Sequence, residues 1–177
     1  MGAIIGVDPG SRTTGVMAIF EDGRAVGVTV TNEGPLLPIA RPYLREIGAT
    51  VDDLISQADG EVTIKVESVT RPNWHVGKGQ GGGAASNPEA LLGTAQVLGA
   101  ILAWYDAEIV PPGRHGSRPM GHYPDALVSA GEKRKPGWET RVGTGKLRHQ
   151  RSAWDIAHYL PPAYSAPRKP STPSPYV

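Results

Sequence analysis

Three acidic residues stand where ordered segments of the chain are expected to end or begin. Asp8 follows the apolar run 3–7, Glu67 closes the run 61–67, and Asp155 lies in the first turn of a final helix. If folding brings these positions together, the carboxylates repel one another and each raises the others' pKa. Oxygen ligands of this kind suit Mg²⁺ or Mn²⁺, and two such ions can support phosphodiester hydrolysis.

Each of these acids also has a structural explanation. Asp8 precedes Pro-Gly and could form a turn, and Glu67 could pair with a neighbouring cation such as Lys65. Ser152 and Asp155 have the spacing of a capping box, in which a serine and an acid three residues later cap a helix. Spacing alone therefore favours three separate structural carboxylates.

The pattern of apolar residues predicts the elements that would position the acids. The expected strands cover 3–7, 14–20, 25–31, 61–67 and 108–110, and the expected helices cover 41–58, 87–105 and 152–160. Asp22-Gly23 is a hairpin turn signal, and Asn87-Pro88-Glu89 is typical of a helix start. The result is an α/β fold with a mixed central sheet flanked by helices. Its hairpin strands are antiparallel, its fourth and fifth strands are parallel to the first, and the helix 87–105 is buried.

Length and composition indicate one folded domain. The 177 residues are 39% hydrophobic, enough for a core, while 23 glycines and 17 prolines predict long loops. We expect a domain over residues 1–160 and a disordered Pro-rich tail over 161–177. The lack of cysteine excludes disulfides and points to a cytoplasmic protein. No apolar stretch reaches the roughly 20 residues that cross a bilayer, so no membrane contact is expected.

Charge is unevenly distributed, although its net value is only +1. Residues 1–110 carry 7 Lys and Arg against 13 Asp and Glu, whereas residues 111–151 carry 9 against 3. The Gly-rich segment 69–86 mixes cations with one tryptophan, which can hold phosphates and stack on an unpaired base. Its alternative is a linker whose tryptophan packs on the core. The candidate nucleic-acid contacts are Arg12, Arg71, Trp74, His75, Lys78, Lys146 and Arg148.

Three motifs, in order, resemble those of the RuvC family of Holliday-junction resolvases. They are GVDPGS at 6–11 followed by TGV at 14–16, IKVE at 64–67, and RSAWDIA at 151–157. The match covers residues 3–160, and the Gly-rich segment after Glu67 is most similar to the phage-encoded form, which would act in the host cytoplasm.

The resemblance implies an RNase H-like fold and cutting of branched DNA, such as a four-way junction, by a homodimer. It also implies two Mg²⁺ ions, replaceable by Mn²⁺, held by Asp8, Glu67 and Asp155.

The chain departs from the family at one position of the final helix. Three residues before the last aspartate the family usually has an acid or a histidine, and this chain has Ser152. His149 is the candidate catalytic replacement, and its alternative is a phosphate contact or an exposed loop histidine. His149 precedes Asp155 by six residues, so in one continuous helix its side chain points about 120° away from that of Asp155. It would reach the metals only if the helix begins near Ser152 and residues 146–151 fold back. Ser152 itself and His158 are the other candidates.

Other functions fit parts of the sequence. A nuclease of the same fold could act on flaps or structured RNA, and a non-catalytic junction-binding protein could keep the fold. An actin-like ATPase would use the loop 10–15 to cradle phosphate, but that architecture needs two domains. Nucleotide binding would favour the ATPase, and cleavage of different substrates with and without Mg²⁺ would separate the others.

Overall fold

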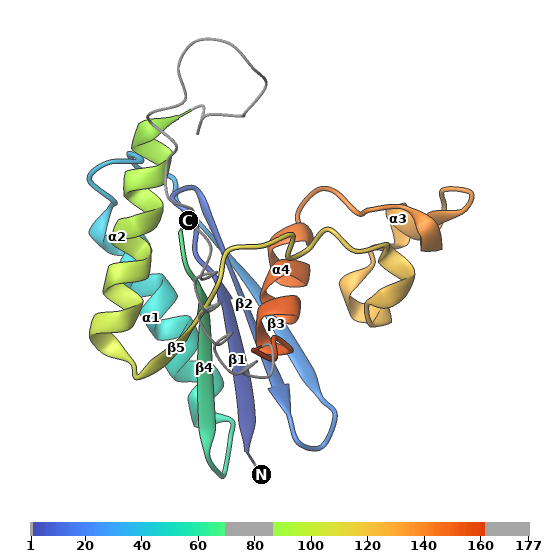
Figure 1. Ribbon diagram of the computed structural model, residues 1–177, viewed down its shortest axis with the longest axis horizontal. Coiled ribbons are helices and arrows are strands. Elements are labelled where there is room, and N and C mark those ends of the chain that lie inside the picture. Colours follow the sequence, from blue (N-terminus) through green and yellow to red (C-terminus); the bar gives the residue numbers. More distant parts are fainter. Residues whose placement is uncertain (1, 70–86, 162–177) are drawn as a thin grey trace, which may run out of the picture.

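The computed structural model describes residues 2–69 and 87–161, which form a five-stranded sheet with helices on both faces (Figure 1). The strands are β1 (Ala3–Asp8), β2 (Thr13–Phe20), β3 (Ala25–Thr31), β4 (Val62–Glu67) and β5 (Ala107–Val110). The helices are α1 (Arg41–Ser56), α2 (Pro88–Trp104), α3 (Ala130–Lys133) and α4 (Arg148–Ala157). Short 3₁₀ helices cover Met120–His122, Asp125–Leu127 and Trp138–Thr140.

The sheet is mixed, as the sequence predicts, with strand order β3-β2-β1-β4-β5. The β1–β2 and β2–β3 pairs are antiparallel, whereas β4 is parallel to both β1 and β5. Val7 pairs with Val66, so Asp8 and Glu67 leave neighbouring parallel strands at the same edge of the sheet. The fold class is therefore the expected α/β arrangement with a mixed central sheet, and its topology brings two of the three acids together.

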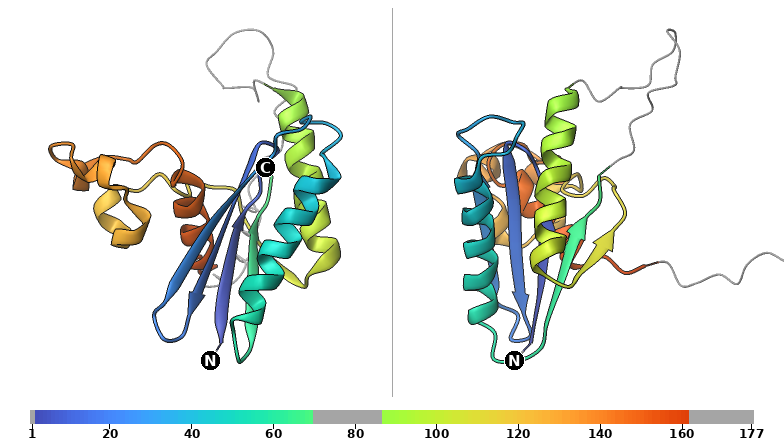
Figure 2. Two further views of the ribbon diagram at one scale, coloured as in Figure 1. Left: turned by 180° about the vertical axis from the view of Figure 1, so that it is seen from behind. Right: turned by 90° about the vertical axis from the view of Figure 1, so that its left-hand side faces the viewer.

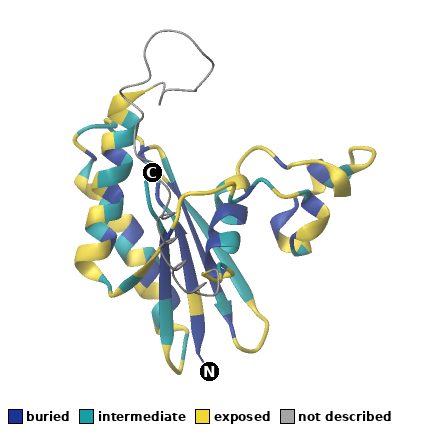
Figure 3. Cartoon of the chain, viewed as in Figure 1, coloured by how far each residue is buried: buried dark blue, intermediate teal, exposed yellow. Residues whose placement is uncertain are grey.

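Helices α1 and α2 cover one face of the sheet, and α4 covers the other (Figures 1 and 2). Ile5, Val7 and Val66 are fully buried toward α1 and α2, together with Ile47 and Ile101. Successive side chains of a strand point to opposite faces, so Asp8 and Glu67 lie on the face that α4 covers. The central strands are mostly buried, while the outer sides of the helices stay exposed (Figure 3).

Two glycines allow α4 to lie directly on the sheet. A Cβ atom at Gly6 would overlap the carbonyl oxygen of Ala153, and one at Gly15 would overlap the carbonyl oxygen of His149. Gly15 is also the strand partner of Asp8. The first turn of α4 is thereby placed above the end of β1.

A small lobe over residues 117–142 extends beside α4, away from α1 and α2 (Figure 2). It packs on the sheet and on α4 through a second apolar cluster, made by Met17, Met120, Tyr123, Leu127, Val128 and Ala153. Arg151 of α4 is 0% exposed and ties the lobe down. Its guanidinium donates to the Leu127 carbonyl at 2.8 Å and to Glu132 Oε1 at 3.1 Å. The sequence predicts neither the lobe nor its helix α3.

The start predicted for the final helix is wrong. Helix α4 begins at Arg148, and its N-cap is Leu147, which makes no side-chain capping bond. Ser152 is therefore a buried residue inside the helix, and the predicted capping box with Asp155 does not form. A capping box is instead present at α3. Packing of the first turn of α4 against Gly15 extends the helix beyond what its local signals indicate.

Helix α2 is less buried than predicted. Its start is confirmed, since the Asn87 side chain accepts the N–H groups of Glu89 and Ala90. Only Gly93, Val97 and Ile101 of the helix are buried. No helix in the described ranges is long and apolar enough to cross a membrane. The Gly-rich segment and almost all of the Pro-rich tail lie outside the described residues.

Candidate active site

Asp8 and Glu67 form a pair of carboxylates at the edge of the sheet. Both side chains are only 15% exposed. Burial, and then the charge of Asp8, raise the pKa of Glu67, against the lowering effects of the Gly113 N–H group and of His115. Two carboxylates that repel each other resist being ionised together, and a proton or a cation relieves the repulsion. The pair is therefore a place where a cation lowers the electrostatic free energy of the fold.

His149 of α4 contacts Asp8, one member of this pair. Its Nδ1 lies 2.9 Å from Asp8 Oδ2, and its side chain is 38% exposed. The sequence predicts that His149 can reach the site only if the helix begins near Ser152. That prediction is wrong. The helix runs through His149, whose backbone lies on Gly15 beside Asp8, so no folding back is needed. The rotation between positions 149 and 155 sends Asp155 in a different direction instead.

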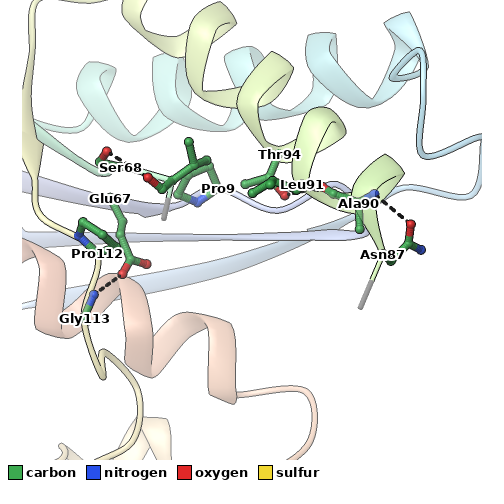
Figure 4. Close-up of a pocket in the computed structure, with 10 residues that line it drawn as sticks. Pro9, Glu67, Ser68, Asn87, Ala90, Leu91, Thr94, Pro112 and Gly113 are labelled. Atoms are coloured by element: carbon green, nitrogen blue, oxygen red, sulfur yellow. Dashed lines mark hydrogen bonds between the residues drawn. The ribbon is translucent and has the colours of Figure 1, made fainter. Parts of the chain in front are cut away.

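The segment after β5 supplies two further contacts to Glu67. The Gly113 N–H group donates to Glu67 Oε1 at 2.9 Å (Figure 4). His115 Nε2 lies 3.8 Å from the same oxygen, and the His115 side chain is 14% exposed. From the sequence, His115 is only one of the residues that could extend the basic surface of region 111–151. Since β5 is parallel to β4, the segment that follows β5 reaches the edge where Glu67 lies, and that signal could have identified the residue.

Asp155 lies apart from the pair, bound by three donors. Its Oδ2 accepts the Gly116 N–H group and the Tyr123 hydroxyl, each at 2.8 Å, and its Oδ1 pairs with the Arg118 guanidinium. Burial, and then Asp155 itself, raise the pKa of Tyr123, so its hydroxyl stays protonated and donates. The structure thus joins two of the three predicted acids and leaves Asp155 with other partners.

A divalent cation fits one part of this arrangement. Asp8 and Glu67 offer the oxygen ligands that Mg²⁺ prefers, and burial makes their shared charge costly without it. Asp155 already has a cationic partner in Arg118. Within residues 2–69 and 87–161, no group of three or more His, Asp and Glu side chains is arranged to hold a metal ion.

Two grooves open near the pair, one lined by Glu67 and the other by His149, the partner of Asp8. One, of about 390 Å³, is lined by Glu67 and Gly113 and by residues at the start of α2, including Asn87 and Thr94 (Figure 4). The other, of about 850 Å³, is lined by His149 and by Thr13, Thr29, Thr31, Lys146 and Gln150. Glu67 lines only the smaller groove, and the larger groove is linked to the pair through His149.

The predicted nucleic-acid contacts are placed unevenly. Lys146 lines the larger groove, and Arg148 is exposed at the start of α4. Arg12 instead uses its guanidinium to bind the carbonyl oxygens of Asn32 and Gly34, at 2.9 and 3.1 Å. The remaining predicted contacts, Arg71, Trp74, His75 and Lys78, lie outside the described residues.

We expect Glu67→Gln to stabilise the protein at pH 7 without divalent cations. Since the folded state raises the pKa of Glu67, it binds the proton more tightly than the unfolded state does, and stability falls as pH rises above the ordinary carboxyl range. Glutamine removes this cost, and the melting temperature should rise by about 2–4 °C, the shift expected for ~1 kcal/mol. Thermal unfolding from pH 4 to 8 checks this. A gain that is equally large at pH 4 would contradict it.

The chain was compared with known families, curated proteins and solved structures. No family model and no curated protein matches the chain. RuvC from Thermus thermophilus in complex with a Holliday junction substrate is 19% identical, with 88% of this chain and 90% of that chain covered and a TM-score of 0.49. A second structure of Thermus thermophilus RuvC is 20% identical over the same shares, with a TM-score of 0.48.

Proposed function

We propose that the protein is an endonuclease that cuts branched DNA, with Asp8 and Glu67 at its catalytic centre. The observation that carries the proposal is the pair of largely buried carboxylates, with one open groove lined by Glu67 and another lined by His149, the partner of Asp8. The protein carries 9 Lys and Arg against 3 Asp and Glu over residues 111–151, which favours a polyanionic substrate. The similar structure with a Holliday junction makes a four-way junction the first substrate to try.

Asp8 and Glu67 would hold Mg²⁺, two ions in the mechanism that the resemblance implies, with Mn²⁺ as a substitute. When bound, the cations supply an activated water and stabilise the charge of the leaving oxygen. The chain's own groups set the geometry. The Gly113 N–H group orients Glu67, and His149 fixes Asp8 and reaches toward the larger groove. Lys146 would bind a backbone phosphate in that groove. Asp155 could become a third metal ligand only if its carboxylate gave up its contacts with Gly116, Tyr123 and Arg118.

Incubation of the protein with a four-way junction, a flap, a duplex and an RNA–DNA hybrid, each with and without Mg²⁺, tests the proposal. We expect the junction to be cut only when Mg²⁺ is present. Preferential cutting of the flap or of RNA would support the proposed nuclease function but with a different substrate. Junction binding with no cutting in Mg²⁺ or Mn²⁺ would indicate a binding protein, and ATP hydrolysis would indicate the phosphate-cradling alternative.

We further propose that the protein acts as a homodimer through α2, since resolving a junction needs two cuts on opposing strands. Leu92, Gly99 and Leu102 share one exposed stripe of the helix, and nothing lies within 4 Å of a Cβ atom built at Gly99. Gly93, the other glycine expected to permit close approach, is instead packed inside the chain against Leu36 and Ser11.

We expect sedimentation at micromolar concentration to show a dimer that Leu102→Glu converts to a monomer, because the charge would be buried in the interface. Leu160→Glu is the matched control, since Leu160 is 81% exposed outside α2. A wild-type protein that stays monomeric with and without junction DNA would contradict the dimer.

A further inference from the structure

The carboxylate of Asp155 is fully used inside the chain. The side chain is only 8% exposed, and its two oxygens accept from Gly116, Tyr123 and Arg118. Asp155 could bind a cation only if it left these groups. The Tyr123 residue, which is 7% exposed, and the Gly116 N–H group would then lose an acceptor, and a buried donor without an acceptor is costly.

The partners of Asp155 belong to a segment that lies directly on α4. Gly116 has a positive φ of 72°, which favours glycine. A Cβ atom there would lie 2.9 Å from the Arg148 carbonyl oxygen and 3.0 Å from the Ser152 nitrogen. Close approach at Gly116 is what lets its N–H group reach Asp155, so the two features depend on each other.

The same segment reaches Glu67 three residues earlier. The Gly113 N–H group binds Glu67 Oε1, and His115 stands beside the same oxygen. The segment is therefore held at two points, by Glu67 near its start and by Asp155 farther on. Any displacement at Asp155 is passed to the group that orients Glu67.

We propose that Asp155 is a positioning residue for the catalytic centre and not a cation ligand. It holds residues 113–123 on α4, so that Gly113 and His115 are presented to Glu67. The inference rests on the proposed nuclease function and deepens it, since it assigns the cation to Asp8 and Glu67 and gives the third predicted acid a different task.

Direct titration of Mn²⁺ into the purified protein, followed by calorimetry, tests the assignment without a cleavage assay. We expect Asp155→Asn to bind Mn²⁺ within about threefold of wild type, whereas Asp8→Asn should bind at least about tenfold more weakly. In junction cleavage, Asp155→Asn should lower kcat by about tenfold to a hundredfold with KM changed by less than about threefold. A loss of Mn²⁺ affinity in Asp155→Asn as large as that in Asp8→Asn overturns the inference.

Arg118→Gln gives an independent test if Asp155→Asn fails to fold. It frees the Asp155 carboxylate from its cationic partner. A metal-binding Asp155 would then bind Mn²⁺ more tightly and cutting would persist, which would overturn the inference. A positioning Asp155 predicts unchanged Mn²⁺ affinity and a lower kcat. The double variant of Arg118→Gln and Asp155→Asn should be no slower than the slower single variant.

The two proposals fail in different ways. If the wild-type protein binds Mn²⁺ and cuts junctions but Asp155→Asn loses Mn²⁺, only the role of Asp155 is wrong. If the wild-type protein neither binds Mn²⁺ nor cuts any substrate, the nuclease itself is wrong, and the positioning role falls with it.

Discussion

Asp8→Asn should abolish junction cleavage, lowering kcat by at least about 10²-fold, while the protein stays folded and still binds the junction. Asparagine has nearly the same volume as aspartate but carries no charge, so the site binds a divalent cation more weakly and loses one of its two carboxylate ligands. The amide can still bond to His149, which lies 2.9 Å from the carboxylate. Rates from single-turnover cleavage and dissociation constants from gel shift would separate the loss of chemistry from any loss of binding.

Asp59→Asn is the matched control for this prediction, because Asp59 is exposed after α1 and lies in no groove lining described above. It should cut at the wild-type rate. Cleavage by Asp8→Asn at the wild-type rate would remove the carboxylate pair from the mechanism.

Arg151→Met should destabilise the protein by about 3–5 kcal/mol, the cost of removing one partner from a buried ion pair. Arg151 is 0% exposed, and its guanidinium joins α4 to Glu132 and to the Leu127 carbonyl. Methionine fills much of the volume but leaves Glu132 without its cation. Urea unfolding measures the loss, and Arg148→Met, an exposed change on the same helix, should cost far less.

The pH dependence of the Arg151→Met effect has a definite sign. Burial acts to raise the pKa of Glu132, but hydrogen bonds from Ser129 and Arg151 outweigh it and lower the pKa. The stability that Glu132 contributes is therefore present above the ordinary carboxyl pKa and is lost as pH falls through the lowered value. The difference between wild type and Arg151→Met should shrink in acid. A destabilisation below ~1 kcal/mol at pH 7 would show that the lobe is held by the second apolar cluster instead.

Local signals in the sequence were sufficient to predict the strands of the sheet and the two acids at the ends of β1 and β4. A short apolar run defines β1 and an alternating pattern defines β4, and both strands end in an acid. The carboxyl ends of parallel strands meet at one edge, so the proximity of Asp8 and Glu67 follows from strand direction alone. The cap of α2 at Asn87 was also predictable, because it depends only on contacts within three residues.

Tertiary contacts decided the rest of the site. The start of α4 depends on close packing against Gly6 and Gly15, which are more than 130 positions away, and its own capping signals point to a later start. His149 reaches Asp8 for that reason. The partners of Asp155 come from a segment without helical or strand periodicity, where no local pattern indicates which side chains meet. The sequence by itself therefore determined which acids the chain carries to the edge of the sheet. Only the packing of α4 and the segment 113–123 decided that His149 joins Asp8 and that Asp155 faces Arg118.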